Sequence, residues 1–238
     1  MRGFDKYALN HQLLLSVSMD EVTALGAGLD ITHDLAKPHH LLTLQGTPAV
    51  WGNLPSGLPY LSFDGAADYL ECLAADSIDL NFTNEDWSMA AWLYNHGPAG
   101  AEIIMSQGVV DVDGWEFFVF SHNLSLRTCQ TPPDHTDISA VDAFAFNAWQ
   151  LVGVTRHGAS GQFYVNGLPV ATTLGVGLTD PTDVAGGDAL WIGKHTTGEF
   201  WHGYMGGGPC GPRIWSPRVL SASDWRAIFE SERHWFGV

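Results

Sequence analysis

The acidic residues with the most suggestive spacing lie in the run Asp111-Val-Asp113-Gly-Trp-Glu116. A glycoside hydrolase needs two carboxyl groups flanking the scissile bond, about 5–9.5 Å apart depending on mechanism. Residues two or four apart on one strand share a face and could supply such a pair. However, Asp113-Gly114 is also typical of a tight turn. A hydrolase using Asp111, Asp113 and Glu116 is therefore the third of three functions that we consider.

Histidines gather in one irregular segment, at His33, His39 and His40. Imidazoles are common ligands of transition metals, but a site also needs further ligands at fixed spacing. The segment offers no such pattern, so we expect these to be surface histidines. The chain also lacks a Gly-x-Ser-x-Gly nucleophile elbow and a phosphate-cradling glycine loop.

Three cysteines occur, at Cys72, Cys129 and Cys210. Their odd, low number and wide spacing argue against a disulfide framework or a zinc site. We expect free thiols, with one bridge as the alternative.

Charge excludes two classes of partner. The 238 residues include 10 Lys and Arg against 26 Asp and Glu, a formal net charge of −16. Nucleic acids and anionic membrane surfaces would both repel such a chain, because their binding depends on Lys and Arg. No apolar run is long enough to span a bilayer, so we expect no membrane insertion. The hydrophobic content of 45% nevertheless predicts a folded core.

Period-two alternation predicts many short strands along the chain. Strands are expected near residues 13–19, 60–65, 68–72, 87–94, 101–107, 115–120, 124–128, 149–155, 162–172, 189–193 and 212–215. Asn166-Gly167 is a strong hairpin signal. Ser221 and Asp224 predict a capped helix over residues 221–231.

These elements predict an all-β fold, a two-sheet antiparallel sandwich with a short C-terminal helix. We expect a single domain over residues 1–238, with residues 1–20 as its leading segment.

Four segments together resemble the laminin-G-like branch of the concanavalin-A-like lectin/glucanase jelly rolls. They are Leu61-Ser-Phe-Asp-Gly-Ala-Ala-Asp-Tyr-Leu70, Trp87 to Trp92, Trp149 to Thr155 with Phe163-Tyr-Val-Asn-Gly167, and Leu190 to Ser223. The resemblance, to a stand-alone bacteriophage-type member, implies a jelly-roll fold and a habit of binding glycans or proteins. The glycine-rich stretch Gly206 to Pro212 departs from the family pattern and is predicted to be a loop.

The resemblance also suggests ligand sites. It places Trp201 and Met205 on the inward face, which leaves His202 and Tyr204 as surface candidates for stacking on a sugar. Asp64 and Asp68 fall in the matching hairpin, where they would shape the turn.

Relatives of this kind often bind calcium, which needs six to eight oxygen ligands. Asp111 and Asp113 could contribute, as could Asp180 and Asp183. The simpler interpretation is that these residues shape turns, and it predicts no cofactor.

The leading functional hypothesis is a non-catalytic virion structural protein, a capsid decoration or tail component. The N-terminal segment lacks an export signal, so the chain is expected to be made in the host cytoplasm and to reach the outside by particle assembly. Capsid or tail proteins, and host-surface glycans, would be its partners, and it would be oligomeric within the assembly. The alternative is an extracellular carbohydrate-binding or adhesion lectin, whose binding could depend on calcium.

Overall fold

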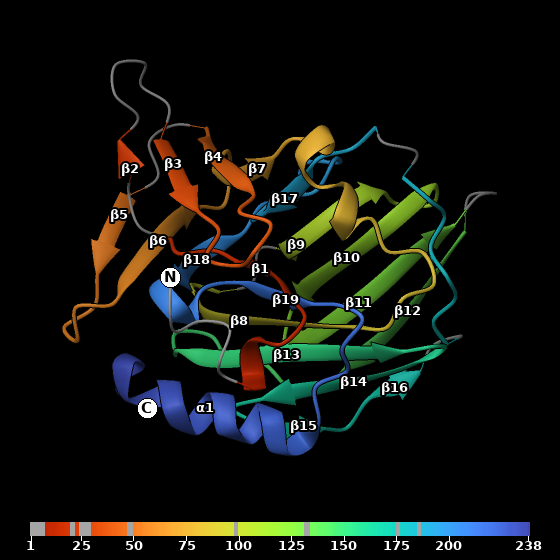
Figure 1. Ribbon diagram of the computed structural model, residues 1–238. Helices are drawn as coiled ribbons and strands as arrows, with labels where there is room; N and C mark the ends of the chain where they lie inside the picture. Colours follow the sequence, from red (N-terminus) through yellow and green to blue (C-terminus); the bar gives the residue numbers. More distant parts are fainter. Residues whose placement is uncertain are drawn as a thin grey trace.

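The computed structural model describes residues 8–19, 22–23, 30–46, 50–97, 100–130, 134–174, 177–184 and 187–238. Two antiparallel sheets pack face to face, as the strand pattern predicts, and one helix lies beside them (Figure 1). No helix in these ranges is both long and apolar enough to cross a membrane.

The first sheet contains β1 (Leu13–Ser16), β5 (Val50–Asn53), β6 (Pro59–Asp64), β8 (Trp87–Asn95), β13 (Gln150–His157), β14 (Ser160–Val165), β15 (Leu168–Val170), β18 (His202–Gly206) and β19 (Arg213–Trp215). Its order is β15-β14-β13-β8-β18-β6-β5, and β19 pairs with both β8 and β1.

The second sheet contains β2 (Val22–Thr23), β3 (Asp30–His33), β4 (Leu41–Gln45), β7 (Tyr69–Cys72), β9 (Ala101–Val109), β10 (Asp113–Phe120), β11 (Asn123–Gln130), β12 (Asp134–Ala140), β16 (Thr173–Leu174) and β17 (Leu190–Ile192). Its order is β16-β12-β11-β10-β9-β17-β7-β4-β3-β2. Short 3-10 turns lie at Ala8–Asn10, Ala74–Asp76, Ile78–Leu80 and Gly208–Cys210, the last inside the predicted glycine-rich loop.

Apolar residues from the inner faces of both sheets form the main core. The alternating set Trp87, Met89, Ala91 and Leu93 of β8 lies in this core, as predicted from its spacing. Cys72, Cys129 and Cys210 are buried free thiols, which confirms the expectation of no disulfide.

The strands on either side of Gly65 were expected to form a hairpin, and this expectation is wrong. β6 pairs with β5 and β18 in the first sheet, whereas β7 pairs with β4 and β17 in the second. The turn between them therefore crosses from one sheet to the other. Asp64 Oδ1 accepts hydrogen bonds from the amides of Ala66 and Ala67 at 2.8 and 2.9 Å, the turn-shaping role that was predicted.

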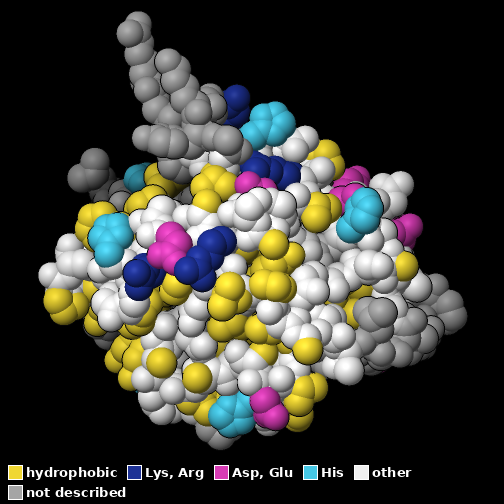
Figure 2. Space-filling model, turned by 90° about the horizontal axis from the view of Figure 1, so that it is seen from below, with side chains coloured by type: hydrophobic (Ala, Val, Ile, Leu, Met, Phe, Trp, Pro, Cys, Tyr) yellow, Lys and Arg dark blue, Asp and Glu magenta, His cyan; other side chains and the backbone are white. Residues whose placement is uncertain are grey.

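Helix α1 (Ala222–Phe236) begins at the predicted Ser221 cap but continues past the predicted end at residue 231. Its last turn is held by packing, because the Phe236 ring stacks on Trp92 at a centroid distance of 4.0 Å. Gly237, with a φ of 72°, then ends the helix. Seen from the side of α1, basic and acidic side chains lie next to one another (Figure 2).

A second apolar cluster lies between α1 and the outer face of the first sheet, and includes Trp92 and Trp225. Glu232 of the helix fixes the contact. It accepts a hydrogen bond from Trp92 Nε1 at 2.8 Å and a two-pronged ion pair from Arg213 at 2.6 and 2.8 Å. Bidentate pairs of this kind add geometric specificity, so they hold the helix in one position on the sheet.

His40 was expected at the surface and is instead buried, with 5% of its area exposed. Its Nδ1 lies 2.6 Å from Asp34 Oδ2 and its Nε2 lies 2.9 Å from Asp79 Oδ1. Burial alone would lower the pKa of His40, but the hydrogen bonds and charges of Asp34 and Asp79 outweigh it and raise the pKa from 6.5 to about 9. His33 and His39 are exposed, as expected.

The first prediction concerns Gly153 of β13, over which the Trp225 ring lies. A Cβ at this position would lie 2.3 Å from the ring, so Gly153→Ala should destabilise the protein by about 1–3 kcal/mol in a urea titration. Gly187→Ala is the control, because its Cβ would lie at an ordinary van der Waals distance of 3.6 Å from the Val184 carbonyl oxygen. Equal stability of the two variants would contradict this packing of α1.

The second prediction concerns His40 and pH. Because the pKa of His40 is raised in the folded state, its stabilising contribution is complete below about pH 6.5 and is lost as pH rises through about 9. The difference in free energy of unfolding between wild type and His40→Gln should therefore shrink by on the order of 2 kcal/mol between pH 6.5 and 9.5. Stability curves that stay parallel over this window would contradict the arrangement.

Candidate functional site

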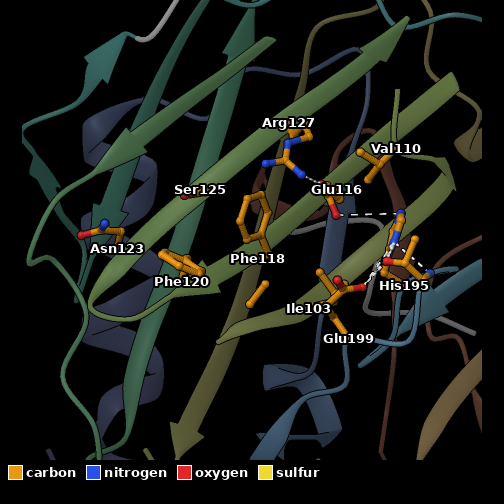
Figure 3. A pocket seen from close by; sticks show the side chains of 12 residues that line it. Ile103, Val110, Glu116, Phe118, Phe120, Asn123, Ser125, Arg127, His195 and Glu199 are labelled. Carbon is orange, nitrogen blue, oxygen red and sulfur yellow. Dashed lines mark hydrogen bonds and ion pairs between the residues drawn. The ribbon is translucent and has the colours of Figure 1, made fainter. Parts of the chain in front are cut away.

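A cavity of about 580 Å³ opens on the outer face of the second sheet, over β9, β10 and β11. This volume falls in the range of small-molecule sites. Its lining residues come from these strands, from the turn after β9 and from the loop after β17 (Figure 3): Ala101, Ile103, Val110, Glu116, Phe118, Phe120, Asn123, Ser125, Arg127, His195, Thr197 and Glu199.

The floor of the cavity follows from alternation along β10. Trp115, Phe117 and Val119 are buried in the main core. Because successive side chains of a strand point to opposite faces, the residues between them point outward into the cavity. The outward set includes Phe118 and Phe120, and Phe120 keeps 51% of its surface exposed.

A buried ion pair lies on this floor. Glu116 and Arg127 are direct partners in the register of β10 and β11, and Arg127 Nη1 lies 2.6 Å from Glu116 Oε1. The Glu116 side chain is 4% exposed and that of Arg127 is 22% exposed. The guanidinium also lies 5.0 Å from the centroid of the Phe118 ring. Burial of the Glu116 charge is tolerated because the arginine compensates it.

The loop over residues 193–201 forms one wall, and backbone hydrogen bonds hold it at both ends. Gly193 donates to Ile104 at 3.1 Å, and Trp201 donates to Gly193 at 2.9 Å. Within the loop, His195 donates to the carbonyl of Glu199 at 3.1 Å. The Trp201 side chain is fully buried in the main core, as expected from the sequence, and anchors the loop.

His195 lies between two carboxylates of the cavity. Its Nε2 is 3.9 Å from Glu116 Oε2, and its Nδ1 is 3.7 Å from Glu199 Oε2. Burial lowers the pKa of His195; the charge of Glu199 opposes this shift, while that of Arg127 adds to it. The imidazole is therefore neutral at pH 7 and can both donate and accept hydrogen bonds.

Asp111 and Asp113, the predicted metal ligands, lie at the turn between β9 and β10. Asp113 Oδ1 accepts a hydrogen bond from the Val109 amide at 2.9 Å, which is the turn-shaping alternative. The other two candidates are also engaged: Asp180 pairs with Arg156 at 2.5 Å, and Asp183 accepts from Asn81 at 2.6 Å. Across the described ranges, no three His, Cys, Asp or Glu side chains are grouped to hold a metal. These residues do not fit a calcium shell of six to eight oxygens.

Of the three residues considered for hydrolysis, only Glu116 lines the cavity, and Asp111 and Asp113 do not. Sequence reasoning did not select Phe118, Phe120, Arg127, His195 or Glu199. The alternation over residues 115–120 could have indicated that Phe118 and Phe120 share the outward face of their strand.

His202 and Tyr204 lie on β18 of the first sheet, and therefore not in this cavity. Both are half-buried in an aromatic group on the sheet surface. Tyr204 stacks on Tyr94 at 5.3 Å between ring centroids, and His202 lies 5.1 Å from His96. Their neighbours Trp201 and Met205 are fully buried, as expected. This aromatic group is separate from the cavity, and the ligand-binding role of His202 and Tyr204 stays a prediction.

Comparisons with known proteins agree with the fold. A family model, Laminin_G_3, described as the concanavalin A-like lectin/glucanases superfamily, matches residues 64–224. No curated protein matches the chain. Similar solved structures include those of botulinum neurotoxins.

Two of these structures illustrate the likeness. One concerns botulinum neurotoxin type C, described as depending on two ganglioside molecules to enter cells, with 15% identity and a TM-score of 0.64. Another is the binding domain of botulinum neurotoxin DC in complex with rat synaptotagmin II, with 15% identity and a TM-score of 0.66. Each match covers 94% of this chain but 52% of the neurotoxin chain.

At this identity the neurotoxin structures show a shared fold, and the binding properties of the longer neurotoxin chains do not transfer with it. The family model, by contrast, spans most of the sandwich, from the turn after β6 to the first turn of α1. The chain therefore belongs to the Laminin_G_3 family of the concanavalin A-like lectin/glucanases superfamily.

Proposed function

We propose that this chain is a non-catalytic carbohydrate-binding module, and that its glycan lies in the cavity on the outer face of the second sheet. The observation that carries the proposal is the combination of Phe118 and Phe120 with hydrogen-bonding groups on the same floor. This function corresponds to the lectin alternative predicted from the sequence.

A sugar ring presents apolar C–H faces and a rim of hydroxyl groups. The half-exposed Phe120 ring offers an apolar surface for such a face. Asn123 lies opposite Phe120 in the register of β10 and β11, Ser125 lies opposite Phe118, and His195 lies at the Glu116 end of the cavity (Figure 3). These three side chains offer both donors and acceptors for hydroxyl groups. The lining thus combines apolar surface with polar side chains that can fix the orientation of a ligand.

Binding is favoured over hydrolysis by the state of the carboxylates. Glu116 is held at 2.6 Å by Arg127, which stabilises its charged form and opposes a general-acid role. Asp111 and Asp113, the other two carboxylates of the sequence hypothesis, do not line the cavity. The second carboxylate of the lining, Glu199, is 40% exposed and accepts a hydrogen bond from Thr197 Oγ1. The neurotoxin structures with this fold are likewise described as binding domains.

A place in a virion, in contact with capsid or tail proteins, is a separate proposal that the sequence alone motivates. None of the relatives described above is a particle protein. Co-sedimentation with intact particles in a density gradient tests this proposal. Calcium dependence of glycan binding is tested by repeating the binding measurement with a chelator.

The third prediction tests the cavity. Phe120→Ala should weaken binding to the best ligands of a glycan array by about tenfold, because it removes a stacking surface. Leu168→Ala on β15 is the matched control, since Leu168 is 54% exposed and does not line the cavity. Both variants should fold, because the side chains that they shorten are largely exposed.

The proposed function is rejected if wild type binds no glycan on the array. The cavity is rejected as the site if both variants bind as wild type does.

A further inference from the structure

The charges that line the cavity do not balance. Among the residues that the structure describes, Arg127 is the one arginine or lysine of the lining, and its guanidinium is already paired with Glu116 at 2.6 Å. A carboxylate and a guanidinium in contact sum to zero charge, so this pair presents little field to a ligand.

Glu199 adds a second carboxylate, on the wall formed by the loop over residues 193–201. Its side chain is 40% exposed, and Thr197 Oγ1 donates a hydrogen bond to it. His195, between the two carboxylates, is neutral at pH 7. The lining therefore carries a net negative charge that comes from Glu199.

The basic residue next to His195 in the sequence does not neutralise the negative charge of the lining. Lys194 precedes His195, but its ammonium lies 4.0 Å from the Tyr69 ring centroid and 5.5 Å from that of Trp191. It is absent from the lining residues. The chain as a whole, at −16, adds to the repulsion of anions.

We propose that the cavity selects neutral oligosaccharides and discriminates against glycans that carry a carboxylate or sulfate group, with Glu199 as the specificity-determining residue. This inference rests on the proposed function and names its ligand class. A neutral sugar donates hydroxyl hydrogen bonds to Glu199, which an ionised acidic group cannot do. An acidic sugar would lose hydration on entering the cavity and would meet the Glu199 charge, and the described lining residues supply no further cation to offset that charge.

The test compares two oligosaccharides that share one core and differ by a single sialic acid or sulfate group. Wild type should bind the acidic member roughly five- to tenfold more weakly than the neutral one in low salt. Higher ionic strength should narrow this ratio, because salt screens the charge of an exposed side chain.

Glu199→Gln keeps the shape of the side chain and removes its charge. The affinities of this variant for the neutral and the acidic oligosaccharide should therefore be nearly equal. Glu230→Gln on α1 is the matched control. Glu230 is 39% exposed, and its loss changes the net charge of the molecule by the same amount. It should leave the ratio unchanged, which separates a local charge in the cavity from the charge of the whole chain.

Equal or tighter binding of the acidic member overturns this inference and leaves the proposed function intact. An unchanged ratio in Glu199→Gln overturns the role of Glu199. Failure to bind any glycan overturns the proposed function and this inference together.

Discussion

Burial of one face of β10 is the constraint on which the candidate site depends. Trp115, Phe117 and Val119 enter the core between the sheets, where large apolar side chains gain most from leaving water. The side chains of the intervening residues must therefore point outward, because a shift of the strand register by one residue would expose all three apolar side chains. The Glu116 carboxylate and the Phe118 ring are thus brought to the same outer surface by the demands of the opposite face.

The two sheets differ in what covers their outer surfaces. On the first sheet, α1 packs over Trp92 and Tyr164, and Glu232 locks it there through Arg213. The charged face of that helix replaces the sheet as the surface that meets solvent. On the second sheet, the strands β9 to β11 keep an uncovered outer face beside the loop over residues 193–201. This uncovered face is concave and partly apolar, and it carries the cavity described above.

Local patterns were sufficient for the sandwich and its helix cap, because alternation and the Ser221 capping box act over a few residues. The helix end was underestimated, since Phe236 is held by a ring 144 positions earlier, Trp92. The cavity could not be predicted in the same way, because its residues come together through strand pairing and tertiary contacts that the sequence pattern does not reveal. Arg127 meets Glu116 through strand pairing, and His195 reaches them from a loop far along the chain. Burial of His40 could not be predicted from the sequence either, because it depends on tertiary packing: its partner Asp34 is itself buried, and its second partner, Asp79, lies 39 residues farther along the chain.

The wall of the cavity is built before any ligand arrives. Backbone hydrogen bonds of Gly193 and Trp201 hold the two ends of its loop, and a backbone hydrogen bond of His195 spans its interior. The Trp201 side chain, which anchors the loop, is fully buried in the core. A binding site whose walls are already ordered loses little conformational freedom on association. The backbone of the free protein should consequently superimpose closely on that of the ligand-bound protein. The association rate should be limited by diffusional encounter with the ligand and not by rearrangement of the loop.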